Sequence, residues 1–235
     1  SLSAINRAEN FYSVLTDGQK TLVTNADVLA AARSSYNELT SVPKQGSAMF
    51  DRSKLQFATY CYRYSLWNDV DMQKLVDAGI DFICGAANYT ELFDLCEKFG
   101  VGALTHYLPW GADPEEYESY AASFVDHPAI WGFELVDEPS SLVYPQLGAS
   151  IAKANELFPD KITYTCLFPN YANMGQMGVG AYAEYIARYV ENVKTDFINY
   201  DHYMYSQDAR KFLENIEIVA DACRENGRDL WIVNQ

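Results

Sequence analysis

The feature that most constrains the fold is a regular alternation of apolar, strand-like segments with amphipathic helical segments from residue 56 onward. The strand-like segments begin at steps of 24, 21, 29, 32, 34 and 34 residues. They are 56–64, 80–86, 101–108, 130–136, 162–168, 196–203 and 230–233. The segments between them predict helices at 71–78, 89–99, 114–124, 147–157, 181–193 and 209–226. Strands that alternate with helices at this interval form a parallel sheet.

An open doubly wound sheet and a barrel share this alternation, and two observations favour the barrel. No Gly-x-Gly-x-x-Gly pattern follows the first predicted strand, which argues against a dinucleotide-binding open sheet. Polar and aromatic residues follow almost every strand, as in barrels, whereas an open sheet gathers them at one switch point. We therefore predict an α/β fold, a TIM (β/α) barrel over residues 43–235. The chain stops at Gln235 as the seventh strand ends, so we expect the natural protein to continue with an eighth unit.

Residues 1–42 have a separate, helical pattern. Apolar residues keep helical spacing up to a break at Asp17-Gly18, a turn is predicted at 19–23, and Asn25 is a plausible N-cap for a second helix through Leu39. Residues 41–53, which contain Pro43 and Gly46, are predicted to be a linker. The pattern predicts either a helical module of its own or an N-terminal extension packed on the barrel.

The sequence of residues 4–39, from Ala-Ile-Asn-Arg-Ala-Glu-Asn-Phe-Tyr to Tyr-Asn-Glu-Leu, resembles that of a small helical module. That module recurs as a spacer in bacterial cell-surface and secreted proteins. The resemblance implies an extracellular or cell-surface location and a multidomain parent chain, whose other domains would be partners of this one.

Composition excludes several classes of partner and site. The net charge of −15 repels phosphate backbones and anionic lipid, so we expect no nucleic-acid binding. No apolar run approaches the roughly 18 residues that a membrane-spanning helix needs, so no membrane insertion is expected. The five cysteines are widely spaced and include no Cys-x-x-Cys pair, so a disulfide framework or a zinc site is not expected. No cofactor is predicted.

The most informative stretch is the fourth predicted strand and the Asp137-Glu138-Pro139 triplet that follows it. Glycosidic cleavage needs one carboxylic acid to protonate the leaving oxygen and a second carboxylate across the sugar. An acid beside another carboxylate can have a raised pKa, because ionising both costs Coulomb energy. We predict Glu138 as the general acid and Asp137 as the residue that tunes it. Alternatively, either carboxylate caps the helix that follows at 140–141. Glu134, expected on the same strand face as Glu138, is a reserve candidate.

Residues 127–139 resemble the fourth strand of the large barrel clan of glycoside hydrolases, clan A. There an Asn-Glu-Pro triplet ends the strand and its glutamate is the general acid/base, and some glycosidase-like barrels carry Asp-Glu-Pro. The resemblance therefore implies hydrolysis of a poly- or oligosaccharide. The clan's nucleophile ends strand seven, where this chain has Gln235 or stops. Three alternatives remain: the nucleophile follows Gln235, Asp201 is the second carboxylate, perhaps as the base of an inverting mechanism, or the barrel binds glycans without hydrolysis.

The other strand ends supply residues suited to a sugar cleft, because flat aromatic rings stack on sugars and polar tips bind hydroxyl groups. Each of these side chains taken singly is also consistent with packing under a loop. The predicted substrate-binding residues are Tyr62, Arg63, His106, Tyr107, Asn170, His202, Tyr203 and Gln235.

Two other functions compete with a glycosidase. His106 and His202 could bind a metal with Asp201 and Glu138, but no His-x-His or His-Glu-x-x-His pattern is present, so no metal ligands are predicted. The main alternative is a non-catalytic carbohydrate-binding barrel of a surface protein. Glycan binding without release of reducing sugar would distinguish that alternative from the predicted enzyme.

Overall fold

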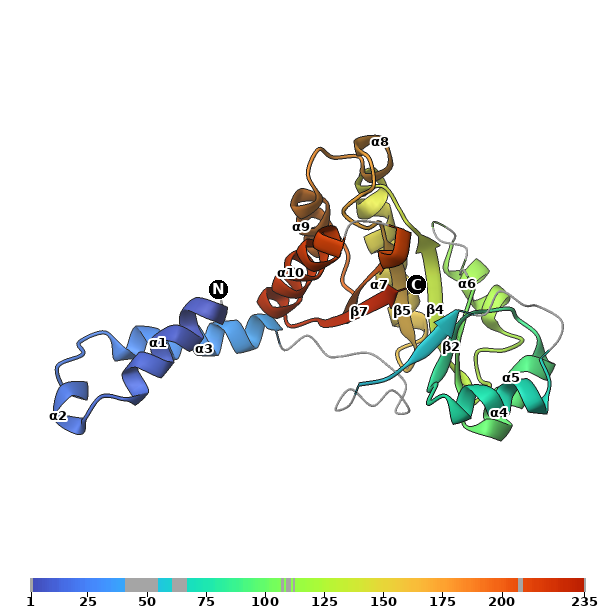
Figure 1. The fold of residues 1–235 in the computed structure, drawn as a ribbon, viewed down its shortest axis with the longest axis horizontal. Coiled ribbons are helices and arrows are strands. Elements are labelled where there is room, and N and C mark those ends of the chain that lie inside the picture. The colour runs from blue at the N-terminus through green and yellow to red at the C-terminus, as the bar shows by residue number, and fades with distance from the viewer. Residues whose placement is uncertain are drawn as a thin grey trace.

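The computed structural model describes residues 2–40, 55–60, 67–106, 108, 111, 113–206 and 209–234. Over this part of the chain, seven strands form one sheet in sequence order, and each is parallel to the next. The strands are β1 (Ala58–Tyr60), β2 (Phe82–Ala86), β3 (Gly102–Thr105), β4 (Ile130–Asp137), β5 (Ile162–Leu167), β6 (Phe197–His202) and β7 (Asp229–Asn234). The predicted (β/α) barrel is therefore confirmed as a curled sheet of seven strands, with β1 and β7 at its two edges (Figure 1).

Helices connect the strands on the outside of the curled sheet (Figure 1). They are α4 (Asp69–Asp77), α5 (Thr90–Phe99), α6 (Pro114–Ala121), α7 (Tyr144–Leu157), α8 (Met174–Met177), α9 (Tyr182–Asn192) and α10 (Ala209–Asn226), with 3-10 turns η1 (Ser141–Val143) and η2 (Met204–Ser206). Helix α7 begins three residues before its predicted start, with Pro145 in its first turn, where a missing N–H costs no hydrogen bond. None of the described helices has both the length and the apolar character needed to cross a membrane.

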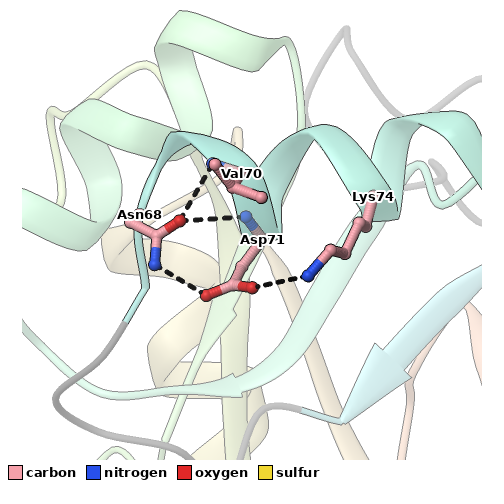
Figure 2. Close-up of polar contacts among 4 residues, drawn as sticks. All are labelled: Asn68, Val70, Asp71 and Lys74. Atoms are coloured by element: carbon pink, nitrogen blue, oxygen red, sulfur yellow. Dashed lines mark hydrogen bonds and ion pairs between the residues drawn. The ribbon is translucent and has the colours of Figure 1, made fainter.

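The first barrel helix shows how local sequence sets an element boundary. The Asn68 side chain accepts hydrogen bonds from the backbone N–H groups of Val70 and Asp71 at 2.9 and 3.1 Å (Figure 2). The Asn68 amide donates to the Asp71 carboxylate at 2.9 Å, and Lys74 forms an ion pair with the same carboxylate at 3.3 Å. These contacts satisfy N–H groups that lack a partner in the first turn of a helix. Helix α4 consequently begins at Asp69, two residues before its predicted start.

The N-terminal segment folds into helices α1 (Leu2–Ser13), α2 (Asp17–Lys20) and α3 (Ala26–Thr40). Helices α1 and α3 contact each other, and Arg33 pairs with Glu9 through two hydrogen bonds of 2.9 and 2.5 Å. The turn predicted at 19–23 is in part the short helix α2, which Thr16 and Gln19 begin with a reciprocal capping box. Whether this segment is a module of its own stays a prediction, and the predicted linker, residues 41–53, lies outside the described residues.

The lower interior of the barrel is filled by an aromatic and aliphatic layer. Trp231 of β7 packs against Phe82 of β2 and Tyr164 of β5, with ring centroids 5.4 and 4.9 Å apart. Gly102 lies against Trp131, and a Cβ atom at Gly102 would come within 2.2 Å of the indole ring. In the described sheet, strands β1 and β7 are not paired with each other, and Trp231 of this layer also lines a cavity along these two edge strands.

A β-bulge in β4 changes which carboxylates face the interior. Glu134 pairs with Tyr164 of β5, and Asp137 pairs with Cys166. Between these two pairs, β4 spans three residue steps and β5 spans two, so β4 contains one extra residue. Because Tyr164 and Cys166 lie on the same face of β5, Glu134 and Asp137 share the interior face of β4. The bulge thus adds Asp137 to the interior face, which strict alternation from Glu134 would have placed on the opposite face.

Candidate active site

The Asp137-Glu138-Pro139 segment is held at the carboxyl end of β4 by contacts to β5. The Thr165 hydroxyl donates to the Val136 carbonyl, and the Glu138 N–H donates to the Cys166 carbonyl at 2.8 Å. Glu138 has a φ of 46°, and no other non-glycine residue in the described part of the chain has a positive φ. A backbone of this kind costs of order 1–3 kcal/mol and is concentrated at functional sites.

Helix capping does not account for the two carboxylates. The following turn η1 begins with Ser140 as its N-cap, whose hydroxyl accepts a hydrogen bond from the Leu142 N–H at 3.4 Å. Asp137 and Glu138 are therefore not the side chains that cap this turn, and the capping alternative is not supported.

The environment of Glu138 suits a proton donor. Burial, the largest cause, and the negative charges of Asp201 and Asp137 together raise the pKa of Glu138 to about 7. A carboxyl group with a pKa in this range keeps its proton in a substantial fraction of molecules near neutral pH. Glu138 can therefore donate a proton where an ordinary glutamate would be ionised.

Asp201 stands at the end of β6 and interacts electrostatically with the β4 carboxylates. The pKa of Asp201 is raised to about 6: burial raises it most, the hydrogen bond with the Tyr203 side chain lowers it, and the charge of Asp137 raises it. The pKa values of Asp201 and Glu138 are therefore both raised toward neutral pH, and the charge of Asp201 opposes the ionisation of Glu138. Two carboxyl groups that do not readily ionise together are the pattern expected of an acid and a base.

A cavity of about 800 Å³ lies along the two edge strands, β1 and β7. Asp137 and Asp201 line it, together with aromatic side chains from three segments: Tyr60, Tyr203 and Trp231. Most of the remaining wall comes from residues 55–59 and 230–234. The described residues of the lining include two carboxylates and no lysine, arginine or histidine, so this wall carries negative charge only.

Below the upper carboxylates lies a second buried acid, Glu134, which is 1% exposed. The pKa of Glu134 is raised to about 7: burial and the charge of Asp137 raise it, and interactions with the Tyr164 and Tyr60 hydroxyls partly oppose the rise. Glu134 sits among groups that are themselves buried, so it supports the floor of the site rather than facing the cavity directly.

Glu134 should make the stability of the protein depend on pH. A carboxyl group whose folded-state pKa is raised leaves the fold most stable below its unfolded pKa and reduces stability as pH rises through the folded pKa. We expect the free energy of unfolding to fall between about pH 4.5 and 7. Glu134→Gln should flatten this slope and gain on the order of 3 kcal/mol at pH 8 relative to pH 4, because each pKa unit corresponds to about 1.4 kcal/mol. Urea denaturation at several pH values measures the effect, and an unchanged slope in Glu134→Gln would refute it.

The structure brings five of the predicted site residues close together at the carboxyl end of the sheet. Glu138, Asp201, Asp137 and Tyr203 come together at the ends of β4 and β6. His106 lies close to Asp137. Burial lowers the pKa of His106, and the charge of Asp137 partly opposes this effect. Gly85 leaves room for this ring, since a Cβ atom there would lie 3.3 Å from His106. The others predicted from strand ends, Tyr62, Arg63, Tyr107 and Gln235, lie outside the described residues.

Asn170 and His202 take positions that differ from the expected ones. The Asn170 amide donates to the Lys211 carbonyl at 2.8 Å, and its backbone N–H donates to Asn215 at 2.7 Å, so Asn170 ties the loop after β5 to α10. His202 is fully buried between the rings of Tyr171 and Phe212, at centroid distances of 5.0 and 5.2 Å. Because consecutive residues of a strand point to opposite faces, His202 faces away from Asp201 and the cavity.

The structure also locates a carboxylate–histidine group away from the site. Asp94 and Glu97 of α5 lie near His127, with His127 Nε2 at 3.2 Å from the Asp94 carboxylate. The Ala129 N–H donates to His127 Nδ1, also at 3.2 Å, so the ring hydrogen is on Nε2 in the neutral tautomer and points at Asp94. His127 thus links the loop before β4 to helix α5 through the Asp94 carboxylate.

Two residues of the site were not selected from the sequence. Asn199 of β6 is 1% exposed, and both polar atoms of its side chain lack a hydrogen-bond partner among the described residues. It alternates with Phe197 and Asp201 and is therefore on the interior face. Trp231 forms part of the cavity wall. The alternation in β6 could have identified Asn199, since a polar residue at an interior strand position is unusual.

No family model matches the sequence, and no curated protein sequence is significantly similar to it. Comparison with solved structures finds barrels of similar fold at low identity. A proposed alpha-L-fucosidase from Bacteroides thetaiotaomicron is 12% identical, with a TM-score of 0.54, over 82% of this chain and 75% of that one. A GH10 xylanase from Thermobacillus composti is 13% identical, with a TM-score of 0.51, over 75% and 66% of the two chains.

A GH18 chitinase from Pseudoalteromonas aurantia, also 13% identical, has a TM-score of 0.50 over 76% of this chain and 79% of its own. The chain thus has a barrel fold that these glycoside hydrolases share. At such low identity the likeness extends to the fold alone, so activity has to be argued from the site.

Proposed function

We propose that the barrel is a glycoside hydrolase in which Glu138 is the general acid and Asp201 is the general base. The observation that carries the proposal is the pair itself. Glu138, directly after β4, and Asp201, on β6, interact electrostatically, and their pKa values are raised to about 7 and about 6. Glu138 gives its proton to the leaving glycosidic oxygen, and Asp201 takes a proton from the attacking water.

The proposed roles correspond to an inverting mechanism, because Asp201 acts on a water molecule and forms no bond to the sugar. Asp137 contributes by its charge, which raises the pKa values of both Glu138 and Asp201.

The substrate class follows from the cavity wall. Tyr60, Tyr203 and Trp231 offer aromatic faces that can stack on sugar rings, and Asp137 and Asp201 add negative charge. We propose a neutral poly- or oligosaccharide as substrate. A location outside the cell, or on its surface, and further domains in the parent chain remain proposals that rest on the helical segment at 1–42.

A panel of oligosaccharides tests the proposal. Reducing-sugar release should occur with a neutral oligosaccharide, and kcat/KM should be at least about tenfold lower for a matched uronic-acid oligosaccharide, because like charges repel in the cavity. Isothermal titration with the same ligands provides the control. Binding without any release of reducing sugar would overturn the hydrolase proposal in favour of a carbohydrate-binding barrel, and a preference for the uronate would overturn the substrate class.

A further inference from the structure

Tyr185 connects helix α9 to the loop that carries Glu138. It is fully buried, and its hydroxyl donates a hydrogen bond of 2.7 Å to the Pro139 carbonyl. The same hydroxyl accepts a hydrogen bond of 3.3 Å from the Phe168 N–H at the end of β5. One side chain thus bridges the segments that follow β4 and β5.

The bridge lies next to the strained residue of the site. Glu138 has a φ of 46° and precedes Pro139, and the residue before a proline is sterically restricted. Such a conformation persists only where surrounding contacts over-determine it. Three contacts surround it: Thr165 to the Val136 carbonyl, the Glu138 N–H to Cys166, and Tyr185 to the Pro139 carbonyl.

The Tyr185 hydroxyl differs from the other two contacts because it comes from a helix. Strand β5 supplies the first two contacts and holds the segment on the side toward β4, before Pro139. Tyr185 holds it on the far side, after Glu138. Its ring is fixed by packing against the rings of Tyr144 at 5.4 Å and Tyr182 at 5.9 Å, so the hydroxyl is pre-positioned.

We propose that Tyr185 is a positioning residue that holds the strained Glu138 in its catalytic orientation through the Pro139 carbonyl. Tyr185 acts through the loop and does not touch the reacting atoms. The inference rests on the proposed role of Glu138. Without the hydroxyl, the Pro139 carbonyl loses its buried donor, the loop relaxes, and the Glu138 carboxyl moves away from Asp201.

Tyr185→Phe tests this, because the ring and its packing are kept while both hydrogen bonds are lost. Tyr189→Phe is the matched control: Tyr189 is a buried tyrosine of the same helix, and its hydroxyl is 2.9 Å from Thr195 instead of the site. We expect Tyr185→Phe to lower kcat by about 10-fold to 100-fold with KM changed by less than about twofold, since small misplacements of a catalytic group are costly. Tyr189→Phe should keep kcat within about twofold.

A second measurement does not depend on catalysis. The titration of Glu138 can be followed by NMR with ¹³C-labelled glutamate and assigned with Glu138→Gln. The titratable groups around Glu138 are Asp137, Asp201, Cys166 and Tyr171. We expect Tyr185→Phe to lower the pKa of Glu138 toward that of a solvated glutamate, because the carboxyl leaves Asp201, and we expect no shift in Tyr189→Phe.

The outcomes separate the two proposals. If the wild-type protein hydrolyses no glycan but Tyr185→Phe shifts the Glu138 titration, the proposed function fails and the positioning of Glu138 stands. If kcat and the Glu138 titration in Tyr185→Phe both match those of Tyr189→Phe, Tyr185 is only a structural residue and the inference is overturned.

Discussion

Glu138→Gln is expected to lower kcat by about 10³-fold on substrates with a poor leaving group, because the amide has no proton to donate to the departing oxygen. Activity on aryl glycosides with a strongly acidic leaving group should fall by less than about tenfold, since such a group departs without protonation. The contrast between the two substrates, measured as kcat under the same conditions, identifies Glu138 as the acid.

The pH dependence supplies a second signature of the same substitution. In the wild-type protein, kcat/KM should decline above about pH 7, because Glu138 loses the proton that it donates. In Glu138→Gln with an activated substrate, this alkaline decline should be absent. Thermal unfolding provides the control for folding, and the midpoint should not drop at pH 8, where Glu138 is a destabilising charge. Unchanged kcat on the poor leaving group would refute the assignment.

Asp201→Asn is expected to have the second-largest effect, a loss of about 10²-fold to 10⁴-fold in kcat, because the amide cannot take a proton from water. The decline of wild-type activity below about pH 6, where Asp201 becomes protonated, should disappear from the residual activity of the variant. Added azide should restore turnover, since this small anion attacks the sugar without a general base. The steady-state rate with and without azide measures the effect.

Asp81→Asn is a matched control for Asp201→Asn. Asp81 lies at the opposite, amino end of the strands, where its carboxylate accepts a hydrogen bond of 2.8 Å from the Phe57 N–H. Its replacement should cost on the order of 1 kcal/mol of stability and leave kcat within about twofold. If Asp81→Asn and Asp201→Asn reduce kcat equally, the loss in Asp201→Asn is a consequence of general destabilisation and the base is another group.

The sequence predicted the order and type of the barrel elements well, because each strand is a short apolar run bounded by polar residues. It also predicted the place of Asp137 and Glu138, since the carboxyl ends of parallel strands gather at one edge. The simple alternation rule would have removed His202 from the site, because Asp201 and His202 are consecutive residues of β6 and point to opposite faces. The bulge in β4 has no comparable signal, and it decides that Glu134 and Asp137 share the interior.

Long-range contacts account for the rest of what the sequence could not show. The hydrogen bond from Tyr185 to Pro139 joins residues 46 apart, and the bond from Asn170 to Lys211 joins residues 41 apart. Tyr185 lies in an amphipathic helix where a tyrosine is an ordinary core residue. The sequence also contains no signal of the positive φ at Glu138, because this position is neither a glycine nor an asparagine.

The central claim, that Glu138 and Asp201 act as acid and base on the two sides of a glycosidic bond, is tested most directly by the stereochemistry of the product. ¹H NMR of the first sugar released, recorded before mutarotation, distinguishes the two anomers. A product with the anomeric configuration opposite to that of the substrate is the predicted result. A product that retains the configuration of the substrate would contradict Asp201 as the base, because retention requires a covalent nucleophile in its place.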